Sequence, residues 1–235
     1  MTEIMILSKI KKISKYIQSR VLYLLDCIQI KRRQPYIKRQ RAMLNNKDFT
    51  LLSNNCNGGV LLHELGLRFN SPLVNLNIPA KDYIQYLKRF EYYNSLTLTF
   101  DAETNRGYPV GKLGDVTIEF IHYKSNEEAF AKWEERKQRI NLDNLFVIFT
   151  EQEDCSKELL EEYDRLPFQN KIVFTYRKYD LLKSAIYLKE FKNNPLGVHM
   201  FLGFKNHFSK KRKYDIFDFV AWFNGETDVN KLLKG

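Results

Sequence analysis

The chain has 235 residues, of which 44% are hydrophobic and 14% aromatic, and this composition excludes an intrinsically disordered protein. Of the formal net charge of +10, residues 1–41 carry +9, from eleven Lys and Arg against two acidic residues. The remaining 194 residues hold 27 basic and 26 acidic groups. A basic N-terminal arm favours an anionic partner such as an acidic membrane surface. Nucleic acid is a weaker candidate, because no aromatic RNA-binding motif or zinc finger accompanies the charge.

Cysteine usage and hydropathy indicate the compartment. Cys27, Cys56 and Cys155 form no C-x-x-C pair, and no apolar run reaches the eighteen residues of a membrane span. The first residues show no small-residue cleavage site typical of a secretory signal. We therefore expect a cytoplasmic protein, with the inner face of the membrane as a second location for its basic arm.

The arm is predicted to be an amphipathic helix over residues 4–30, with lysines and arginines around an aliphatic stripe. The stripe consists of Ile6, Ile10, Ile13, Ile17, Val21, Leu24 and Ile28. Pro35 is expected to end or bend this helix, and the arm, 1–45, meets the body near residue 45. The stripe either packs on the body or lies in a membrane interface. Packing is favoured, because a folded chain normally covers a long aliphatic face.

The body, 46–235, alternates β-rich and helical stretches. In the first half of the body we expect a strand at 48–53 and then helices at 58–66 and after Pro79. Strands follow at 95–100 and 115–123, on either side of a turn-rich loop at 101–114. In the second half we expect a helix that begins at Ser125, a strand at 144–150, an acidic helix at 156–166 and a strand at 171–176. The pattern S-x-x-E at Ser125 predicts a capping box. Such alternation predicts an α/β fold with three layers, a mostly parallel sheet and helices on both faces. We also expect a division into two subdomains near residue 125.

The stretch "SNNCNGG", residues 53–59, is the first candidate site. It lies between a strand and a helix, where ligands bind in open α/β sheets, so Asn54 and Asn55 are candidate ligand-binding residues. A helix N-terminus at this point would lower the pKa of the Cys56 thiol and offer N–H groups to an anion. His122 is the better candidate base for such a nucleophile, and Asp115 would complete the catalytic set. The alternative for Cys56 is a buried structural thiol beside a turn.

The helix after Ser125 contains a second candidate. Its apolar stripe is interrupted by Arg136, with Arg139 one turn later. A half-buried guanidinium needs an anionic partner, which is either an internal carboxylate such as Asp115 or Glu119, or a ligand phosphate. Trp133 on the same stripe is expected to be a core residue. The Asp-x-Asp pattern of metal-dependent glycosyltransferases is absent, so no metal site is predicted.

A family resemblance adds a biological setting. The segments "SNNCNGG", "LGLRFNSPLVNL", "YPVGKLGDVTIEFIHY", "EEAFAKWEERKQRIN" and "NLFVIF" together resemble a bacterial family of unknown function often labelled exopolysaccharide biosynthesis protein. The resemblance covers roughly residues 46–205. It implies a cytosolic protein that works near nucleotide-linked or lipid-linked sugars.

Two classes of function remain open at this stage. The first is an enzyme of surface-polysaccharide assembly, such as a transferase on a nucleotide-linked or lipid-linked sugar. The second is a non-catalytic scaffold that docks on an acidic membrane or on another protein of the pathway. The sequence indicates no cofactor and no oligomeric state, and a cleft that gathers the candidate residues would favour the enzyme.

Overall fold

The computed structural model describes residues 2–101, 106–198, 201–206 and 208–234, with side chains for Tyr16 and from residue 20 onward. Its larger sheet, sheet A, has the strand order β1-β5-β6-β7, and every neighbouring pair is parallel. The four strands are β1 (Thr50–Ser53), β5 (Leu145–Thr150), β6 (Asn170–Thr175) and β7 (Ala185–Tyr187). The predicted parallel sheet is therefore confirmed.

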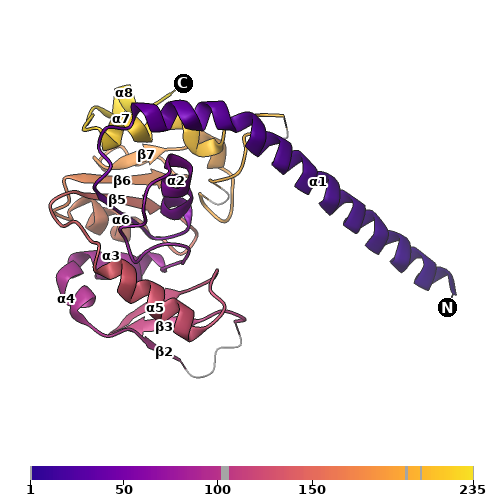
Figure 1. Cartoon of the computed structure of the whole chain (residues 1–235), viewed down its shortest axis with the longest axis horizontal. Helices are drawn as coiled ribbons and strands as arrows, with labels where there is room; N and C mark the ends of the chain where they lie inside the picture. Colours follow the sequence, from indigo (N-terminus) through magenta and orange to yellow (C-terminus); the bar gives the residue numbers. More distant parts are fainter. Residues whose placement is uncertain (1, 102–105, 199–200, 207, 235) are drawn as a thin grey trace.

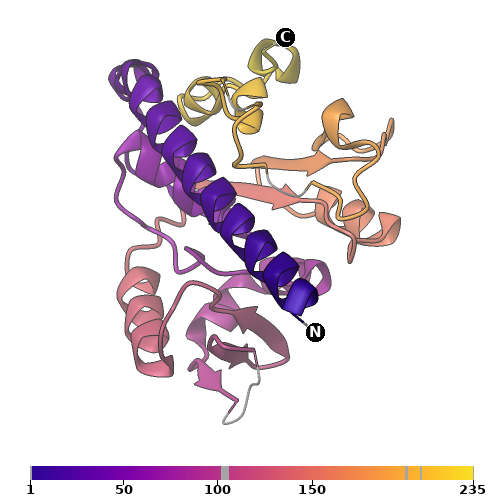
Figure 2. The same ribbon diagram turned by 90° about the vertical axis from the view of Figure 1, so that its right-hand side faces the viewer.

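Helices cover both faces of sheet A, as Figures 1 and 2 show. Alternate residues of β5 separate the two cores, with Phe146 and Ile148 on one face and Val147 and Phe149 on the other. The first face packs against α2 (Asn57–Leu65), α7 (Phe219–Phe223) and α8 (Val229–Leu232), and the second against α3 (Ala80–Lys88) and α6 (Lys157–Asp164). The three-layer α/β architecture follows from strands that are apolar on both sides.

A smaller antiparallel sheet, sheet B, lies in the segment that joins α2 to β5. It contains β2 (Thr99–Phe100), β3 (Val110–Leu113) and β4 (Val116–Glu119), with α4 (Phe90–Ser95) before it and α5 (Asn126–Lys137) after it. The expectation of a plain loop over 101–114 was wrong in part, because β3 forms there. Gly114, at φ 62°, adopts the left-handed conformation that reverses the chain between β3 and β4.

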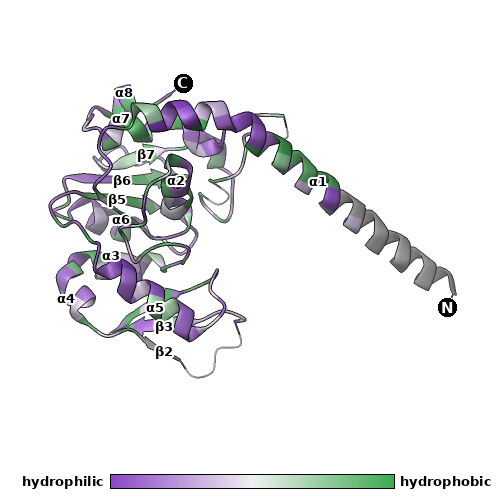
Figure 3. Cartoon of the chain, viewed as in Figure 1, coloured by the Kyte–Doolittle hydropathy of each residue, from purple (hydrophilic) through white to green (hydrophobic). Residues whose placement is uncertain are grey.

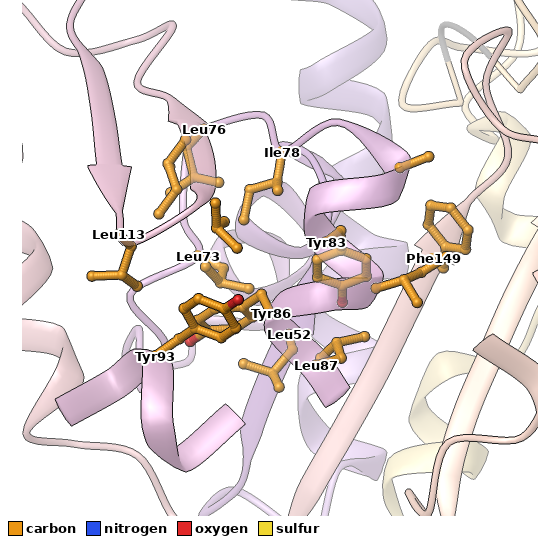
Figure 4. Packing of buried hydrophobic residues seen from close by; sticks show 14 of the residues in the cluster. Leu52, Leu73, Leu76, Ile78, Tyr83, Tyr86, Leu87, Tyr93, Leu113 and Phe149 are labelled. Carbon is orange, nitrogen blue, oxygen red and sulfur yellow. The ribbon is translucent and has the colours of Figure 1, made fainter. Parts of the chain in front are cut away.

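The second face of sheet A and sheet B share one apolar core, part of which Figure 4 shows. Tyr83 of α3 is fully buried there, and its hydroxyl donates to the carbonyl of Ile148, 3.0 Å away. The core includes Phe120 and Trp133, which lie on opposite sides of residue 125 in the chain. The expected division into two subdomains near that residue stays a prediction.

Helix α5 begins after the predicted N-cap Ser125, but the return bond of the capping box is made to the preceding residue, Lys124, and not to Ser125. The Ser125 hydroxyl accepts from the N–H of Glu128 at 3.2 Å, and the Glu128 carboxylate accepts from the N–H of Lys124 at 2.9 Å. This pair of bonds satisfies two donors at the helix start. Trp133 is fully buried, which confirms its role in the core.

The arm helix α1 extends over Thr2–Met43 and continues through Pro35, so Pro35 does not end it. Figure 1 shows its C-terminal half lying on the body and its N-terminal half projecting away, with a change of direction between them. Proline removes one backbone hydrogen bond, which permits such a bend. None of the described helices is long and apolar enough to cross a membrane.

The aliphatic stripe of α1 does not pack on the body where its side chains are described. Val21, Leu24 and Ile28 are all exposed, so the favoured packing was wrong for these three residues. The body is contacted instead by the face that carries Gln29 and Arg33, both of which are buried. The side chains of Ile6, Ile10, Ile13 and Ile17 lie outside the described residues.

Candidate functional site

The carboxyl ends of β1 and β5 form the natural ligand-binding position of sheet A. After β1 the chain enters α2 on one face of the sheet, whereas after β5 it enters α6 on the other face. Two neighbouring parallel strands whose connections diverge in this way leave a crevice between their carboxyl ends. We call the residues that meet there, Ser53, Asn54, Asn57, Gly58 and Thr150, the β1 crevice.

Two asparagine side chains connect the segment after β1 to Thr150 at the end of β5. The Asn54 amide is buried, accepts from the N–H of Thr150 at 3.1 Å and donates to the Thr150 carbonyl at 3.3 Å. The Asn57 amide nitrogen donates to the Thr150 hydroxyl at 3.1 Å. Asn54 therefore extends the pairing of the two strands beyond Ser53. Both polar atoms of its side-chain amide are used in these structural hydrogen bonds.

The N-terminus of α2 lies beside Ser53 at the β1 crevice. The Asn55 side chain accepts from the N–H of Asn57 at 3.0 Å, and the first turn contains no acidic residue. Within the described residues, no acceptor lies in hydrogen-bonding range of the N–H groups of Gly58 and Gly59. Free N–H groups at the positive end of a helix dipole form a binding position for an anion.

The Ser53 hydroxyl is the most unusual group of the β1 crevice. It is buried and has no hydrogen-bond partner among the described residues. Ser53 shares a strand face with Leu51, two residues earlier, and this face packs against α2. A Cβ atom on Gly58 would lie 2.8 Å from the Ser53 Cβ and 3.5 Å from its hydroxyl oxygen. The hydroxyl therefore lies directly beside the first turn of α2, and only glycine fits opposite it.

Cys56 is the N-cap residue of α2, but its thiol is not activated. Burial raises the pKa of the Cys56 thiol to about 11, and a backbone hydrogen bond opposes this shift only in part. The sulfur lies 3.7 Å from the carbonyl oxygen of Leu76. The expected lowering of the pKa was wrong, because desolvation outweighs the helix N-terminus at this position.

The other two members of the expected catalytic set lie apart from each other. Asp115 precedes β4, is exposed and accepts from the Tyr93 hydroxyl at 2.6 Å. His122 follows β4 in an exposed turn. They stand at opposite ends of the strand, and no hydrogen bond or ion pair among the described residues links either of them to Cys56. Because an extended strand separates Asp115 from His122, at most one of them can lie beside Cys56, and the expected contact of Cys56 with His122 or Asp115 stays a prediction.

Arg136 has a partner of a different kind from the one expected. Its guanidinium donates to the Tyr123 hydroxyl at 2.6 Å and lies 5.3 Å from the centre of the Phe69 ring. The predicted internal partners are occupied elsewhere, since Glu119 pairs with Arg106. Within the described part of the chain, Arg136 has no carboxylate partner.

Tyr123 places Arg136 near the start of α2. Burial raises the pKa of Tyr123, the Arg136 guanidinium opposes this shift, and Cys56 adds to it. The Tyr123 hydroxyl also donates to the Val74 carbonyl at 2.7 Å, and a Cβ atom on Gly59 of α2 would lie 3.2 Å from the Val74 side chain. Arg139, by contrast, lies just beyond the end of α5, pairs with Glu135 of that helix and donates to the Phe69 carbonyl at 3.3 Å.

Sequence reasoning missed a fully buried carboxylate beside the crevice. Glu151 directly follows β5 and accepts from the N–H of Tyr176 at 2.9 Å and from the Tyr179 hydroxyl at 2.7 Å. It also forms an ion pair with Arg177 at 2.6 Å. The sequence did contain a signal for this carboxylate. Glu151 directly follows the apolar run of β5, and a buried charge in this place needs several partners.

A second missed cluster fixes α1 to the body. We call it the arginine clasp, and it contains Arg33, Glu64, Arg212, Tyr214 and Asp215. The Arg33 guanidinium is buried and pairs with Glu64 at 2.9 Å and with Asp215 at 2.5 Å. Arg212 donates to Glu64 at 2.7 Å, and the Tyr214 hydroxyl also donates to Glu64. No spacing in the sequence indicated this set, since its members come from three distant segments.

Comparison with known proteins places the chain in a family. A family model described as a domain of unknown function, DUF1919, matches residues 28–224. An uncharacterized protein of Haemophilus influenzae is 42% identical over 197 residues, which cover 80% of this chain and 93% of that protein. Neither description states a reaction. The chain belongs to the DUF1919 family, and its function has to be argued from the residues of its own sites.

Proposed function

We propose that the protein binds the diphosphate of a nucleotide-linked or lipid-linked sugar in the β1 crevice, and that it acts as a cytoplasmic sugar transferase in exopolysaccharide or other cell-surface polysaccharide assembly. The polysaccharide setting is supported by the family resemblance of the sequence. The diphosphate is supported by the chemistry of the crevice, which offers hydrogen-bond donors and no acidic side chain in the first turn of α2.

The observation that carries the proposal is the Ser53 hydroxyl. A buried hydroxyl without a partner lowers the stability of the folded protein by about 1–3 kcal/mol. Because this hydroxyl lies beside two free N–H groups, a single bound acceptor could form hydrogen bonds with all three donors. A phosphate oxygen accepts several hydrogen bonds at once and meets that need. Binding of the phosphate would thus remove the cost of the unpaired Ser53 hydroxyl, and this gain would contribute to the affinity.

Neighbouring residues suit the rest of such a ligand. Asn55 and Asn57 are partly exposed and offer polar groups to a sugar. Arg136 supplies a guanidinium without a carboxylate partner in the described structure, near Cys56 through Tyr123. Arg136 would offset the charge of a diphosphate or of a leaving nucleotide, a role for which arginine is well suited.

The test is a thermal-shift and calorimetric screen with inorganic diphosphate, UDP-glucose, GDP-mannose and a short-chain polyprenyl diphosphate. A ligand that binds only the folded state raises the melting temperature by mass action. Ser53→Ala should weaken the binding of the active compound by about 10- to 100-fold, the loss of one hydrogen bond to a charged group. Gly58→Ala should abolish it, because the new Cβ meets Ser53.

Thr175→Ala is the matched control. Thr175 also carries a buried hydroxyl without a described partner, but it ends β6, away from α2. The proposal fails if no diphosphate compound shifts the melting temperature, or if the two alanine variants weaken binding equally. Binding without transfer to any acceptor would support the alternative, a scaffold of the same pathway.

A further inference from the structure

The arginine clasp holds α1 in one orientation on the body. Arg33 and Gln29 are buried against the body, and the Gln29 amide donates to the carbonyls of Asn206 and Ser209, each at 2.7 Å. Leu24 and Arg33 are nine residues apart, which at about 100° per residue puts them on opposite sides of the helix. The aliphatic stripe therefore cannot turn toward the body while the clasp is closed.

The exposed stripe is apolar and continuous as far as it is described. Val21 is 49% exposed, Leu24 59% and Ile28 51%. Figure 3 shows hydrophobic residues on the part of α1 that has already left the body. Aliphatic side chains that recur along one helix face and stay in contact with water indicate an interaction surface.

A loop of the body continues this surface with an aromatic residue. Arg32 follows Ile28 by one turn on the same face of α1 and donates to the carbonyl of Phe208 at 3.4 Å. The Phe208 side chain is 79% exposed. The same loop carries Lys205, Lys210 and Lys211, all exposed. An exposed aromatic ring among lysines thus lies at the edge of the stripe.

From these contacts we infer that α1 and the loop 203–213 form a docking surface for an anionic lipid bilayer, with Val21, Leu24, Ile28 and Phe208 entering the interface and the lysines facing the headgroups. We call it the bilayer surface. A basic helix that exposes apolar side chains can lie in the plane of a membrane, and besides the stripe Tyr23 is 62% exposed and Ile30 44%. The inference goes beyond the proposed sugar-phosphate site and does not depend on it.

Charge decides among the occupants of the bilayer surface. A second copy of the chain would bring together two arms of +9 each, from residues 1–41, which repel each other. A nucleic acid would neutralise the lysines but leave the aliphatic stripe in water. Of these three occupants, an anionic bilayer is the one that covers both kinds of group.

Flotation of the full-length protein with vesicles tests the inference, using phosphatidylglycerol–phosphatidylcholine vesicles against pure phosphatidylcholine. The protein should bind the anionic vesicles, and binding should weaken as salt rises from about 0.1 M to 1 M, since the Debye length falls from roughly 10 to 3 Å. Val21→Gln/Leu24→Gln/Ile28→Gln should lower binding at least about tenfold, and Phe208→Ser should lower it to a smaller extent.

Leu181→Ser is the matched control, because Leu181 is 91% exposed on the β6–β7 connection and takes no part in the bilayer surface. It should bind vesicles as the wild type does. Unchanged thermal unfolding of each variant shows that the body is intact. Equal binding to neutral and anionic vesicles, or anionic binding that survives the triple substitution, overturns the inference. So does a dimer of the wild type that the triple substitution converts to a monomer, because the stripe is then covered by a second copy.

Discussion

The arginine clasp and the β1 crevice both bury polar groups, but they treat them in opposite ways. In the clasp the carboxylates of Glu64 and Asp215 have Arg33 as a partner, and Arg212 and the Tyr214 hydroxyl add bonds to Glu64. In the crevice, the Ser53 hydroxyl has no described partner. A network that satisfies its own members holds structure together, whereas the unpaired Ser53 hydroxyl beside the first turn of α2 is the feature that the proposed ligand would satisfy.

The clasp also explains why α1 buries the charged side chain of Arg33 while its aliphatic stripe stays exposed to solvent. Arg33 is 1% exposed, whereas Leu24 on the same helix is 59% exposed. For Arg33 and Leu24, burial follows the partner that the body offers and not the hydropathy of the residue. Four predictions sharpen the contrast between the clasp and the crevice.

The largest effect is expected for Arg33→Ala. Removal of the guanidinium leaves the buried Asp215 and the partly buried Glu64 without their main partner, which should lower the free energy of unfolding by about 3–5 kcal/mol. Urea unfolding measures the change. Arg39→Ala on the same helix is the control, because Arg39 is exposed and should matter by less than about 0.5 kcal/mol. Equal losses for both variants would contradict a structural role specific to the clasp.

The Cys56 thiol should be far less reactive than a free thiol. With a pKa raised to about 11 by burial, it holds about 100-fold less thiolate at neutral pH than a thiol with the ordinary value of 9. Alkylation by iodoacetamide in a Cys27→Ser/Cys155→Ser background should be correspondingly slow in the folded protein and fast in urea. A fast reaction of the folded protein at pH 7.5 would restore Cys56 as a candidate nucleophile.

Acid should open the clasp. Burial raises the pKa of Glu64, but the hydrogen bonds from Arg33 and Tyr214 outweigh this, so its folded pKa lies below the unfolded value. The stabilisation is therefore present above the unfolded pKa, near 4.3, and is lost as pH falls through the folded pKa. Unfolding free energies of wild type and Glu64→Gln at several pH values measure this. Parallel pH profiles for the two proteins would show that Glu64 contributes nothing to the acid response.

The smallest effect is expected for Ser53→Ala in the absence of ligand. Removal of a buried hydroxyl that has no partner should leave the free energy of unfolding unchanged or raise it by up to about 1 kcal/mol. Asn54→Ala should instead cost about 1–3 kcal/mol, because it breaks both bonds to Thr150. If Ser53→Ala destabilises the protein as much as Asn54→Ala does, the hydroxyl has a structural partner and the crevice loses its main argument.

Local signals in the sequence predicted the local structure well. Runs such as 144–150 are apolar on both sides and became strands of the parallel sheet, and Ser125 caps α5 as its spacing indicates. The position of the crevice was also predictable, since a strand, two glycines and a helix follow one another at residues 50–65. These features depend on neighbours within a few residues, which the sequence displays directly.

The sequence by itself therefore determined the α/β alternation, the helical arm and the strand–glycine–helix order of residues 50–65. Only the tertiary structure decided that Asp115 and His122 stand at opposite ends of β4, that Arg136 meets Tyr123 and that the aliphatic stripe of α1 faces away from the body. It also decided the partners of Arg33, which come from residues 31 and 182 positions away in the chain. Periodicity reports which residues share one face of a helix or strand, but a pairing between distant segments depends on how the layers pack and on which buried charges find each other.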